Sequence, residues 1–294
     1  VNNALDIDRR GLGALHDWAH GGRLGNYATV NGRSVPQFSV VSGQRVRLRA
    51  VNIANSRIMT LRFPQAPAWV IALDGQPVKP LELDTGQGTR APGQRADLAV
   101  DLPGTPGSES SIELRLQNQV LEVARFGYQH GQKRKLRTVP PEPLPPNPAN
   151  EVVMPETTSF KRVPLRLEGG AMGGLRSAVY KGRELGFREL ARINQVWAIN
   201  GIAGLDNAPL FRVPRGTAIN LEVDNNNAWP HGMHVHGHHF VDSREPWFWR
   251  DTALFARGER ANLRFIADNP GKWLIHCHMI EHQAGGMLTW FEVS

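Results

Sequence analysis

Residues 273–287 read WLIHCHMIEHQAGGM, and residues 229–240 read WPHGMHVHGHHF. These two stretches hold eight of the chain's 11 histidines and its only cysteine, Cys277. A single cysteine cannot form a disulfide within its own chain. A lone thiol between two histidines therefore indicates either metal binding or nucleophilic catalysis.

The later stretch divides its side chains between two faces if it forms a strand. Because side chains alternate along a strand, Trp273, Ile275 and Cys277 point one way, and His276 and His278 point the other. We expect the cysteine side to face the core of its domain and the two histidines to face away from it. One short peptide thus predicts two sites on opposite sides of a sheet.

The earlier stretch repeats this division, because His234 and His236 share one face and His231 has the opposite parity. The residues expected on the core side are His231, Cys277, His282 and Met287. The residues expected on the outer side are His234, His236, His276 and His278.

The core-side set has the composition of a blue-copper electron-transfer site, which uses two imidazoles, one thiolate and one weak thioether. Gly285 and Gly286 let the backbone bend tightly before Met287. Bound copper would hold Cys277 as a thiolate. The four outer imidazoles suit copper, although zinc, iron and nickel also bind imidazole. We favour copper, because the covalent link through Cys277 would carry an electron from one metal site to the other.

A nucleophilic cysteine is the other chemistry that these residues permit. Neighbours in a strand face apart, so His276 and His278 are poorly placed as its bases. An inert buried cysteine leaves the full ligand spacing unexplained. We expect His238 and His239 to be structural or to orient ligands. Three further histidines have no ligand-like spacing and are predicted not to bind metal: His16, His20 and His130.

The rest of the sequence predicts mainly strands. Apolar residues recur with period two over residues 45–50, 112–116 and 219–223, which is typical of strands. Turn pairs such as Asp74-Gly75 separate such segments. Many short strands with turns between them favour β-sandwiches and an all-β fold class.

The best helical pattern spans residues 183–192. A proline-rich segment over residues 138–158 favours extended backbone and excludes a central strand. We therefore predict a first domain at residues 1–137, this linker, and a second domain at residues 159–294, each of ordinary domain size.

The composition is that of an ordinary globular protein, with 294 residues, 40% hydrophobic and a net charge of +7. The positive excess lies in the first half and includes a local cluster at residues 133–137. No nucleic-acid motif accompanies it, so we predict a solvated surface and no nucleic-acid partner. No apolar run reaches about 18 residues, so no membrane span is expected. Residues 1–10 do not read as a signal peptide.

The two histidine-rich stretches resemble the multicopper oxidase family, which includes laccases. The matching motifs are His231-x-x-His234-x-His236-Gly237 and His276-Cys277-His278-x-x-x-His282-x-x-x-x-Met287. Residues 249–252 (WRDT), 22–26 (GRLGN) and 29–32 (TVNG) are also similar to family segments. The resemblance implies two cupredoxin-like Greek-key β-sandwich domains, the middle one without copper ligands and the last one binding copper.

The resemblance also implies a role for each ligand. His231, Cys277, His282 and Met287 would bind the type 1 copper. His234 would bind the type 2 copper, and His236, His276 and His278 the type 3 pair. Electrons would enter near His231 and His282 and pass through Cys277 with His276 and His278.

The chain departs from the family in one respect. The family's trinuclear cluster needs two further His-x-His motifs, and no such pair precedes His234. We therefore expect the second and third domains of a three-domain oxidase, with the missing amino-terminal domain upstream or on another chain. The expected reaction takes electrons from a small reducing substrate, a phenol or aromatic amine, and reduces oxygen to water. Glu281 and Asp251 are candidate proton acceptors, although each is more often a surface or hydrogen-bonded carboxylate.

Three alternatives stay open at this point: a blue-copper electron carrier, a copper nitrite reductase, and a scaffold that has lost its metal. The nitrite reductase accounts poorly for the His276 and His278 pair together with His234 and His236. The family resemblance implies a periplasmic or secreted location.

Overall fold

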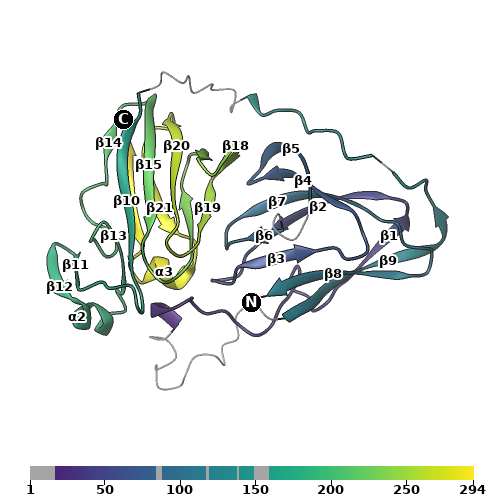
Figure 1. Cartoon of the computed structure of the whole chain (residues 1–294), viewed down its shortest axis with the longest axis horizontal. Coiled ribbons are helices and arrows are strands. Elements are labelled where there is room, and N and C mark those ends of the chain that lie inside the picture. The colour runs from purple at the N-terminus through teal and green to yellow at the C-terminus, as the bar shows by residue number, and fades with distance from the viewer. Residues whose placement is uncertain (1–16, 84–87, 117–118, 138, 149–158) are drawn as a thin grey trace.

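The computed structural model describes residues 17–83, 88–116, 119–137, 139–148 and 159–294. It contains two β-sandwiches side by side and only short helices (Figure 1). The predicted all-β fold class is confirmed. Among the described residues, no helix is long and apolar enough to cross a lipid bilayer.

The first sandwich is built from residues 37–133. Its five-stranded sheet has the order β1 (Gln37–Ser42), β9 (Gln119–Lys133), β8 (Glu109–Leu116), β3 (Met59–Arg62), β6 (Thr89–Arg90). Its four-stranded sheet has the order β2 (Arg45–Val51), β7 (Arg95–Asp101), β4 (Ala68–Leu73), β5 (Gln76–Glu82). The inner faces of the two sheets enclose one apolar core.

The second sandwich is built from residues 161–293. Its six-stranded sheet has the order β13 (Trp197–Ile199), β10 (Lys161–Gly169), β15 (Thr217–Asn225), β20 (Arg260–Ala267), β17 (Phe240–Asp242), β18 (Glu245–Arg250). Its five-stranded sheet has the order β14 (Arg212–Val213), β22 (Leu288–Val293), β21 (Gly271–Cys277), β16 (His231–Val235), β19 (Thr252–Phe255). A hairpin of β11 (Ser177–Tyr180) and β12 (Arg183–Gly186) extends from one end of this sandwich, and α3 (Ile280–Ala284) follows β21.

The period-two segments form strands where the sequence predicted them, in β2, β8 and β15. In β15, Ile219, Leu221 and Val223 are buried in the core of the second sandwich. The predicted turn at Asp74-Gly75 joins β4 to β5, with positive φ at both residues.

The predicted helix at residues 183–192 is only partly correct. Residues 183–186 form β12, which pairs with β11 across a turn at Lys181-Gly182 with positive φ at both residues. The helix α2 (Phe187–Arg192) begins after Gly186, whose backbone N–H donates to the Glu189 carboxylate. Hairpin pairing therefore took the first four residues out of the helical pattern.

The predicted proline-rich linker is described only at residues 139–148, which form no strand. Residue 138 and residues 149–158 lie outside the described residues, as do residues 1–16 with His16. The described part is anchored at Val139, whose carbonyl accepts from Arg45, and at Asn147, whose amide donates to Gln76. The domain boundaries stay a prediction.

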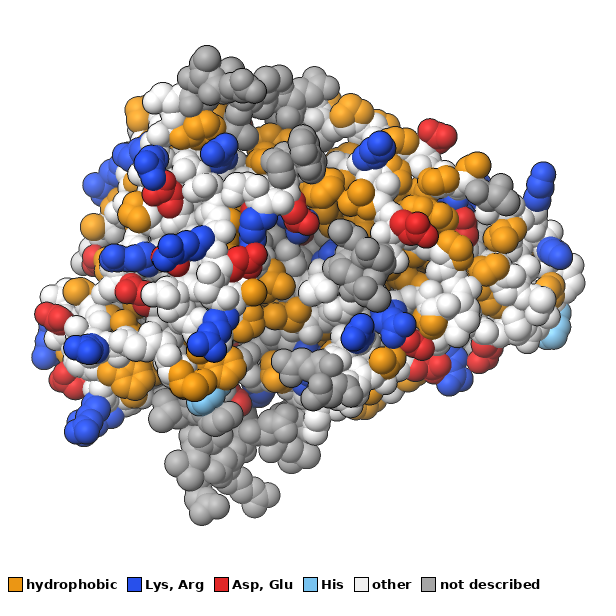
Figure 2. Space-filling model, viewed as in Figure 1, with side chains coloured by type: hydrophobic (Ala, Val, Ile, Leu, Met, Phe, Trp, Pro, Cys, Tyr) orange, Lys and Arg blue, Asp and Glu red, His pale blue; other side chains and the backbone are white. Residues whose placement is uncertain are grey.

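The sandwiches meet where β18 lies against β4 and β5. The face in view carries positive and negative side chains interspersed with apolar ones (Figure 2). The basic cluster at residues 133–137 is exposed, as predicted for a solvated surface.

Candidate metal centre

Strands β16 and β21 lie side by side and carry most of the predicted ligands. They pair antiparallel, with Met233 opposite Cys277 and His234 opposite His276. Residues opposite each other share a face of a sheet. Met233 and Cys277 therefore point into the core, where both are fully buried, and the two histidines point away from it. The alternation predicted for β21 is present.

Three of the four predicted core-side ligands converge. His231 Nδ1 lies 3.0 Å from His282 Nδ1, and Cys277 Sγ lies 3.6 and 3.7 Å from these two atoms. A point equidistant from three atoms so spaced lies about 2.0 Å from each, close to the ~2.0–2.3 Å bonds of nitrogen and sulfur to a divalent zinc ion. The donor set therefore has the dimensions of a transition-metal site.

The hydrogen bonds of the two imidazoles also favour a cation between them. His282 Nε2 donates to the His20 carbonyl oxygen at 2.7 Å, and His231 Nε2 donates to Asn227 Oδ1 at 3.0 Å. Neutral imidazole carries one proton, so both Nδ1 atoms present lone pairs. Two lone pairs at 3.0 Å repel each other unless a cation lies between them. Oxygen acceptors behind ligating histidines are typical of metal sites.

Burial sets the protonation of these groups. It lowers the pKa of His282 to about 4. Burial, followed by the neighbouring His282, lowers the pKa of His231 well below its ordinary value. Both imidazoles are therefore neutral, as ligation requires. Burial raises the pKa of the Cys277 thiol to about 12, so the thiolate needs a compensating cation.

The fourth predicted ligand, Met287, is fully buried in the same core as Cys277. Its carbonyl oxygen accepts from the Cys277 backbone N–H at 3.0 Å. The chain turns at Gly286, immediately before Met287. Gly286 has φ +119° and lies so close to Trp197 that an added Cβ would be 2.2 Å from the Trp197 carbonyl oxygen. The predicted glycine bend is present.

Trp197 is a residue of this centre that the sequence did not reveal. Its ring centroid lies 4.2 Å from that of His282 and 5.1 Å from that of His231. Its Nε1–H donates to the Trp18 carbonyl oxygen at 2.5 Å. Trp197 therefore fixes both imidazoles, and no local pattern in β13 signals that role.

Both imidazoles of the core-side set are shielded from solvent. His231 and His282 are fully buried. The cover consists of Asn227 and of residues 17–22, which precede the first sandwich in the chain. Within that segment the His20 ring packs edge-on against Trp229, with the ring centroids 5.1 Å apart. His20 thus contacts the centre through its backbone.

The outer histidines form a second cluster beside β21. His236 Nε2 lies 2.9 Å from His276 Nε2, and the ring centroids of His234 and His236 are 4.7 Å apart. These three residues have the proximity of a metal-binding group. His278 stands slightly apart, with its ring centroid 5.7 Å from that of His276 and 5.9 Å from that of His234. The structure brings all four predicted outer residues to one face.

The outer imidazoles present the opposite nitrogen. His234 Nδ1 donates to the Asp251 carbonyl oxygen at 2.8 Å, and His276 Nδ1 donates to the Cys277 carbonyl oxygen at 2.9 Å. Their Nε2 atoms are therefore free of protons and available to a metal. Burial, the largest cause, lowers the pKa of His276 to about 4, which keeps it neutral.

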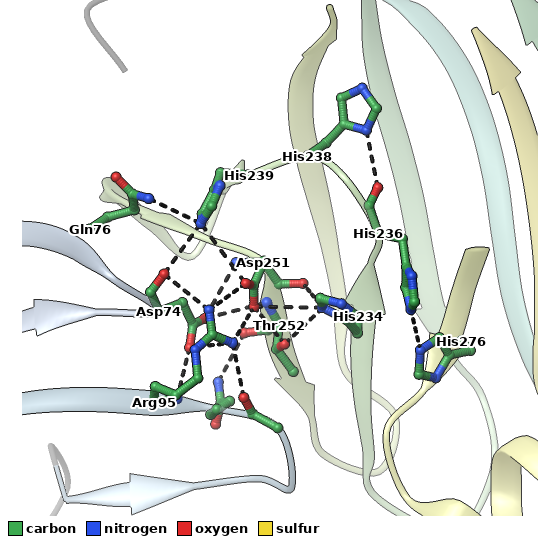
Figure 3. Close-up of polar contacts among 12 residues, drawn as sticks. Asp74, Gln76, Arg95, His234, His236, His238, His239, Asp251, Thr252 and His276 are labelled. Atoms are coloured by element: carbon green, nitrogen blue, oxygen red, sulfur yellow. Dashed lines mark hydrogen bonds and ion pairs between the residues drawn. The ribbon is translucent and has the colours of Figure 1, made fainter. Parts of the chain in front are cut away.

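Charged residues from both sandwiches surround His234 (Figure 3). Burial works against ionisation of Asp251, but its hydrogen bonds with His234 and Arg95 hold its pKa below its usual value. Burial and the charge of Asp251 raise the pKa of Asp74. Asp251 is thus a hydrogen-bonded carboxylate beside the outer histidines.

The remaining candidates have structural partners. Glu281 is buried and accepts from Ser56 Oγ at 2.6 Å. His238 Nδ1 donates to the His236 carbonyl oxygen at 3.1 Å, so it supports the loop that carries a candidate ligand. His239 lies 3.1 Å from the Gln76 amide, between the two sandwiches.

Comparisons with known proteins agree with this geometry. Two family models, both described as multicopper oxidase, match residues 16–108 and 185–294. The multicopper oxidase MmcO of Mycobacterium tuberculosis is 28% identical over an alignment of 283 positions, and the match covers 90% of this chain and 50% of that protein. The iron multicopper oxidase fer1 of Mycosarcoma maydis is 33% identical over an alignment of 105 positions, and the match covers 29% of this chain and 17% of that protein.

A solved multicopper oxidase from Pseudomonas thermotolerans superimposes with a TM-score of 0.74 at 28% identity. The match covers 95% of this chain and 62% of that one. By the alignment with MmcO, the chain spans about half the length of that relative.

Cupredoxin-like sandwiches with a buried cysteine and two histidines at one point define a class of copper-binding proteins. This chain belongs to the multicopper oxidase family, whose cofactor is copper.

Proposed function

We propose that the chain is part of a laccase-like oxidoreductase. That enzyme takes single electrons from a small reducing substrate at a type 1 copper and passes them to a trinuclear cluster that reduces oxygen to water. The observation that carries this proposal is the shared strand: Cys277 ends β21 in one donor set while His276 lies on the opposite face in the other.

The proposed ligands follow the two donor sets. His231, Cys277, His282 and Met287 would hold the type 1 copper. His234 holds the type 2 copper, and His236, His276 and His278 hold the type 3 pair.

Copper bound to these sets supplies the one-electron chemistry. The chain's own residues hold the donors in place. Asn227 and the His20 carbonyl orient two imidazoles, and Trp197 packs against both. The backbone of β21 keeps Cys277 and His276 one residue apart, which provides a covalent route between the sets.

The outer set is incomplete for a trinuclear cluster. His234 keeps 19% of its side chain exposed, so its face is open to further ligands. We propose that a further domain, upstream or on another chain, supplies two His-x-His motifs there. Under this proposal residues 1–137 are the middle domain, residues 138–158 are the linker and residues 159–294 are the copper-binding domain. The enzyme works in the periplasm or outside the cell.

The proposed substrate is a phenol or an aromatic amine. The cover over the core-side imidazoles is aromatic at Trp229 and His20. The nearby carboxylate of Glu281 is buried against Ser56, so it does not face a docking metal ion. Stacking on the aromatic cover suits an aromatic donor.

The test uses the chain reconstituted with cupric ion. We expect an intense blue absorption band that bleaches, without air, when a hydroquinone is added: one electron reduces the metal, and the donor loses one electron and one proton. Absence of the band, or a band that hydroquinone leaves unchanged, would sink the proposal. Oxygen consumption should appear only when the domain with the missing histidines is supplied. An electron carrier would never consume oxygen, and a nitrite reductase would recover its band on addition of nitrite.

A further inference from the structure

The turn between β6 and β7 reads APGQ at residues 91–94, and Arg95 begins β7. The turn carries no candidate metal ligand, yet it lies against Gly232 of β16 and against His278, which follows β21. Ala91 sits beside Gly232 of β16, where an added Cβ would lie 3.1 Å from the Ala91 Cβ. Gly93 lies against His278, because a Cβ at Gly93 would come within 2.3 Å of the His278 Cδ2. The first sandwich therefore packs directly beneath the outer histidines.

Gln94 fastens this turn to the second sandwich. Its Oε1 accepts from the Ala91 backbone N–H at 2.7 Å, and its Nε2 donates to the Thr252 carbonyl oxygen at 3.0 Å. Thr252 lies opposite His234 in the pairing of β16 with β19. The buried amide of Gln94 thus connects the turn to the residue beside a candidate ligand.

Arg95 extends the connection to the ligand itself. Its guanidinium donates twice to the Asp251 carboxylate, at 3.0 and 2.5 Å. The backbone carbonyl of Asp251 accepts the Nδ1–H of His234 at 2.8 Å. Asp74, 3% exposed, holds the same segment, since its carboxylate accepts from the backbone N–H groups of Asp251 and Thr252 at 3.3 Å. Figure 3 shows this chain of contacts running from the first sandwich to His234.

We propose that Arg95 is a positioning residue for His234, acting through Asp251. The two-point grip on the carboxylate fixes residue 251, and the carbonyl of residue 251 fixes the ring rotation and the proton of His234. The lone pair of Nε2 is thereby aimed at the outer metal site. The inference rests on the proposed function only in taking this face as a copper site.

A simple interdomain ion pair would have a different signature. A pair that only holds the sandwiches together acts on both donor sets or on neither. Among the described residues, Arg95 hydrogen-bonds with Asp251, whose carbonyl holds His234, and its hydrogen bonds reach no residue that adjoins Cys277. Loss of the hydrogen bonds between Arg95 and Asp251 should therefore weaken copper binding at the outer set alone. The planar guanidinium also matters, because a lysine ammonium cannot make the two parallel hydrogen bonds.

The experiment compares Arg95→Met and Arg95→Lys with Arg47→Met in the full chain. Arg47 is the matched control, because its guanidinium pairs with the carboxylate of Asp97 within the first sandwich and not with a residue of the second. Copper titration of the metal-free protein measures two affinities. The growth of the blue band gives the affinity of the core-side set, and the copper that binds without adding to this band gives the affinity of the outer set. We expect Arg95→Met to weaken the outer copper about 10–100-fold, as for other residues behind metal ligands. The core-side copper should be unchanged, Arg95→Lys intermediate, and Arg47→Met without effect.

A double-mutant cycle with His234→Ala tests the route. If Arg95 acts through His234, Arg95→Met adds no further loss in the His234→Ala background. Full additivity, equal losses at both copper sites, or no loss at the outer site would each overturn the proposal.

If the wild-type chain, which lacks part of the proposed cluster, binds no outer copper, a metal-free readout decides the positioning role. The proposed function is tested separately, by the blue band and its bleaching by hydroquinone. The nitrogen-15 resonances of His234 in the metal-free protein should report the Nδ1–H tautomer, and Arg95→Met should mix in the other tautomer. An unchanged His234 tautomer in Arg95→Met would overturn the positioning role by itself.

Discussion

Replacing Gly93 with alanine tests how the first sandwich supports the outer histidines. Gly93 follows Pro92 in the turn and has φ +83°, which an alanine adopts at a cost of about 1–2 kcal/mol. A Cβ there would also lie 2.3, 2.6 and 2.7 Å from three atoms of the His278 ring. Non-bonded atoms cannot approach so closely, so either the His278 ring or the turn that carries residue 93 must shift.

The size of the effect follows from these two terms. Overpacking in a well-packed region costs about 1–3 kcal/mol. The expected loss in free energy of unfolding is therefore about 2–5 kcal/mol when the φ cost is added. Gly32→Ala is the matched control, since Gly32 has φ +75° in the same domain and nothing within 4 Å of an added Cβ. It should lose only the first term, so the difference between the two variants isolates the contact with His278.

Chemical denaturation of the metal-free variants gives the two free energies, and copper titration gives the outer-site affinity. We expect Gly93→Ala to be less stable than Gly32→Ala by about 1–3 kcal/mol and to bind outer copper more weakly, with the blue band retained. Equal stabilities together with unchanged outer copper would refute the contact between residue 93 and His278.

Three further outcomes follow from the centre. Cys277→Ser should abolish the blue band and the core-side copper while outer copper remains, as measured by absorption and by copper per chain; a surviving band would exclude the thiolate ligand. Because burial raises the pKa of the Cys277 thiol to about 12 while that of His282 falls to about 4, the thiol is protonated and the imidazole neutral from about pH 6 to 9. Copper binding should then release one proton, and core-side affinity should rise about tenfold per pH unit; flat affinity in a pH series would contradict this. Trp197→Ala should lower the free energy of unfolding by about 3–5 kcal/mol and weaken core-side copper, whereas Trp197→Phe should keep the ring contact with His282; equal unfolding midpoints for the two variants would contradict the packing role.

The sequence predicted the parts of this structure that depend on local chemistry. Period-two alternation located β2 and β15, because each side chain's face follows from its position in the strand. The same rule separated Cys277 from His276. The helical pattern was wrong at residues 183–186, because pairing of β12 with β11 depends on a turn that precedes this pattern in the chain.

The sequence could not predict contacts between distant segments. Trp197 packs on His282, and the His20 carbonyl accepts from the same ring, across separations that no periodicity encodes. The sequence treated His20 as a non-ligand and gave its backbone no role. A Pro-Gly pair at residues 92–93 signals a turn, but nothing in it says that the turn faces His278.

Because of these long-range contacts, the two donor sets differ in how completely the chain encloses them. The core-side set is enclosed by its own domain and by the backbone of residues 17–22, so its donors converge without outside help. The outer set depends on a turn of the other sandwich and keeps His234 partly exposed. Copper should therefore fill the core-side set first, and the affinity of the outer set for copper should rise when a partner surface covers it. A titration in which the blue band appears last would contradict this order.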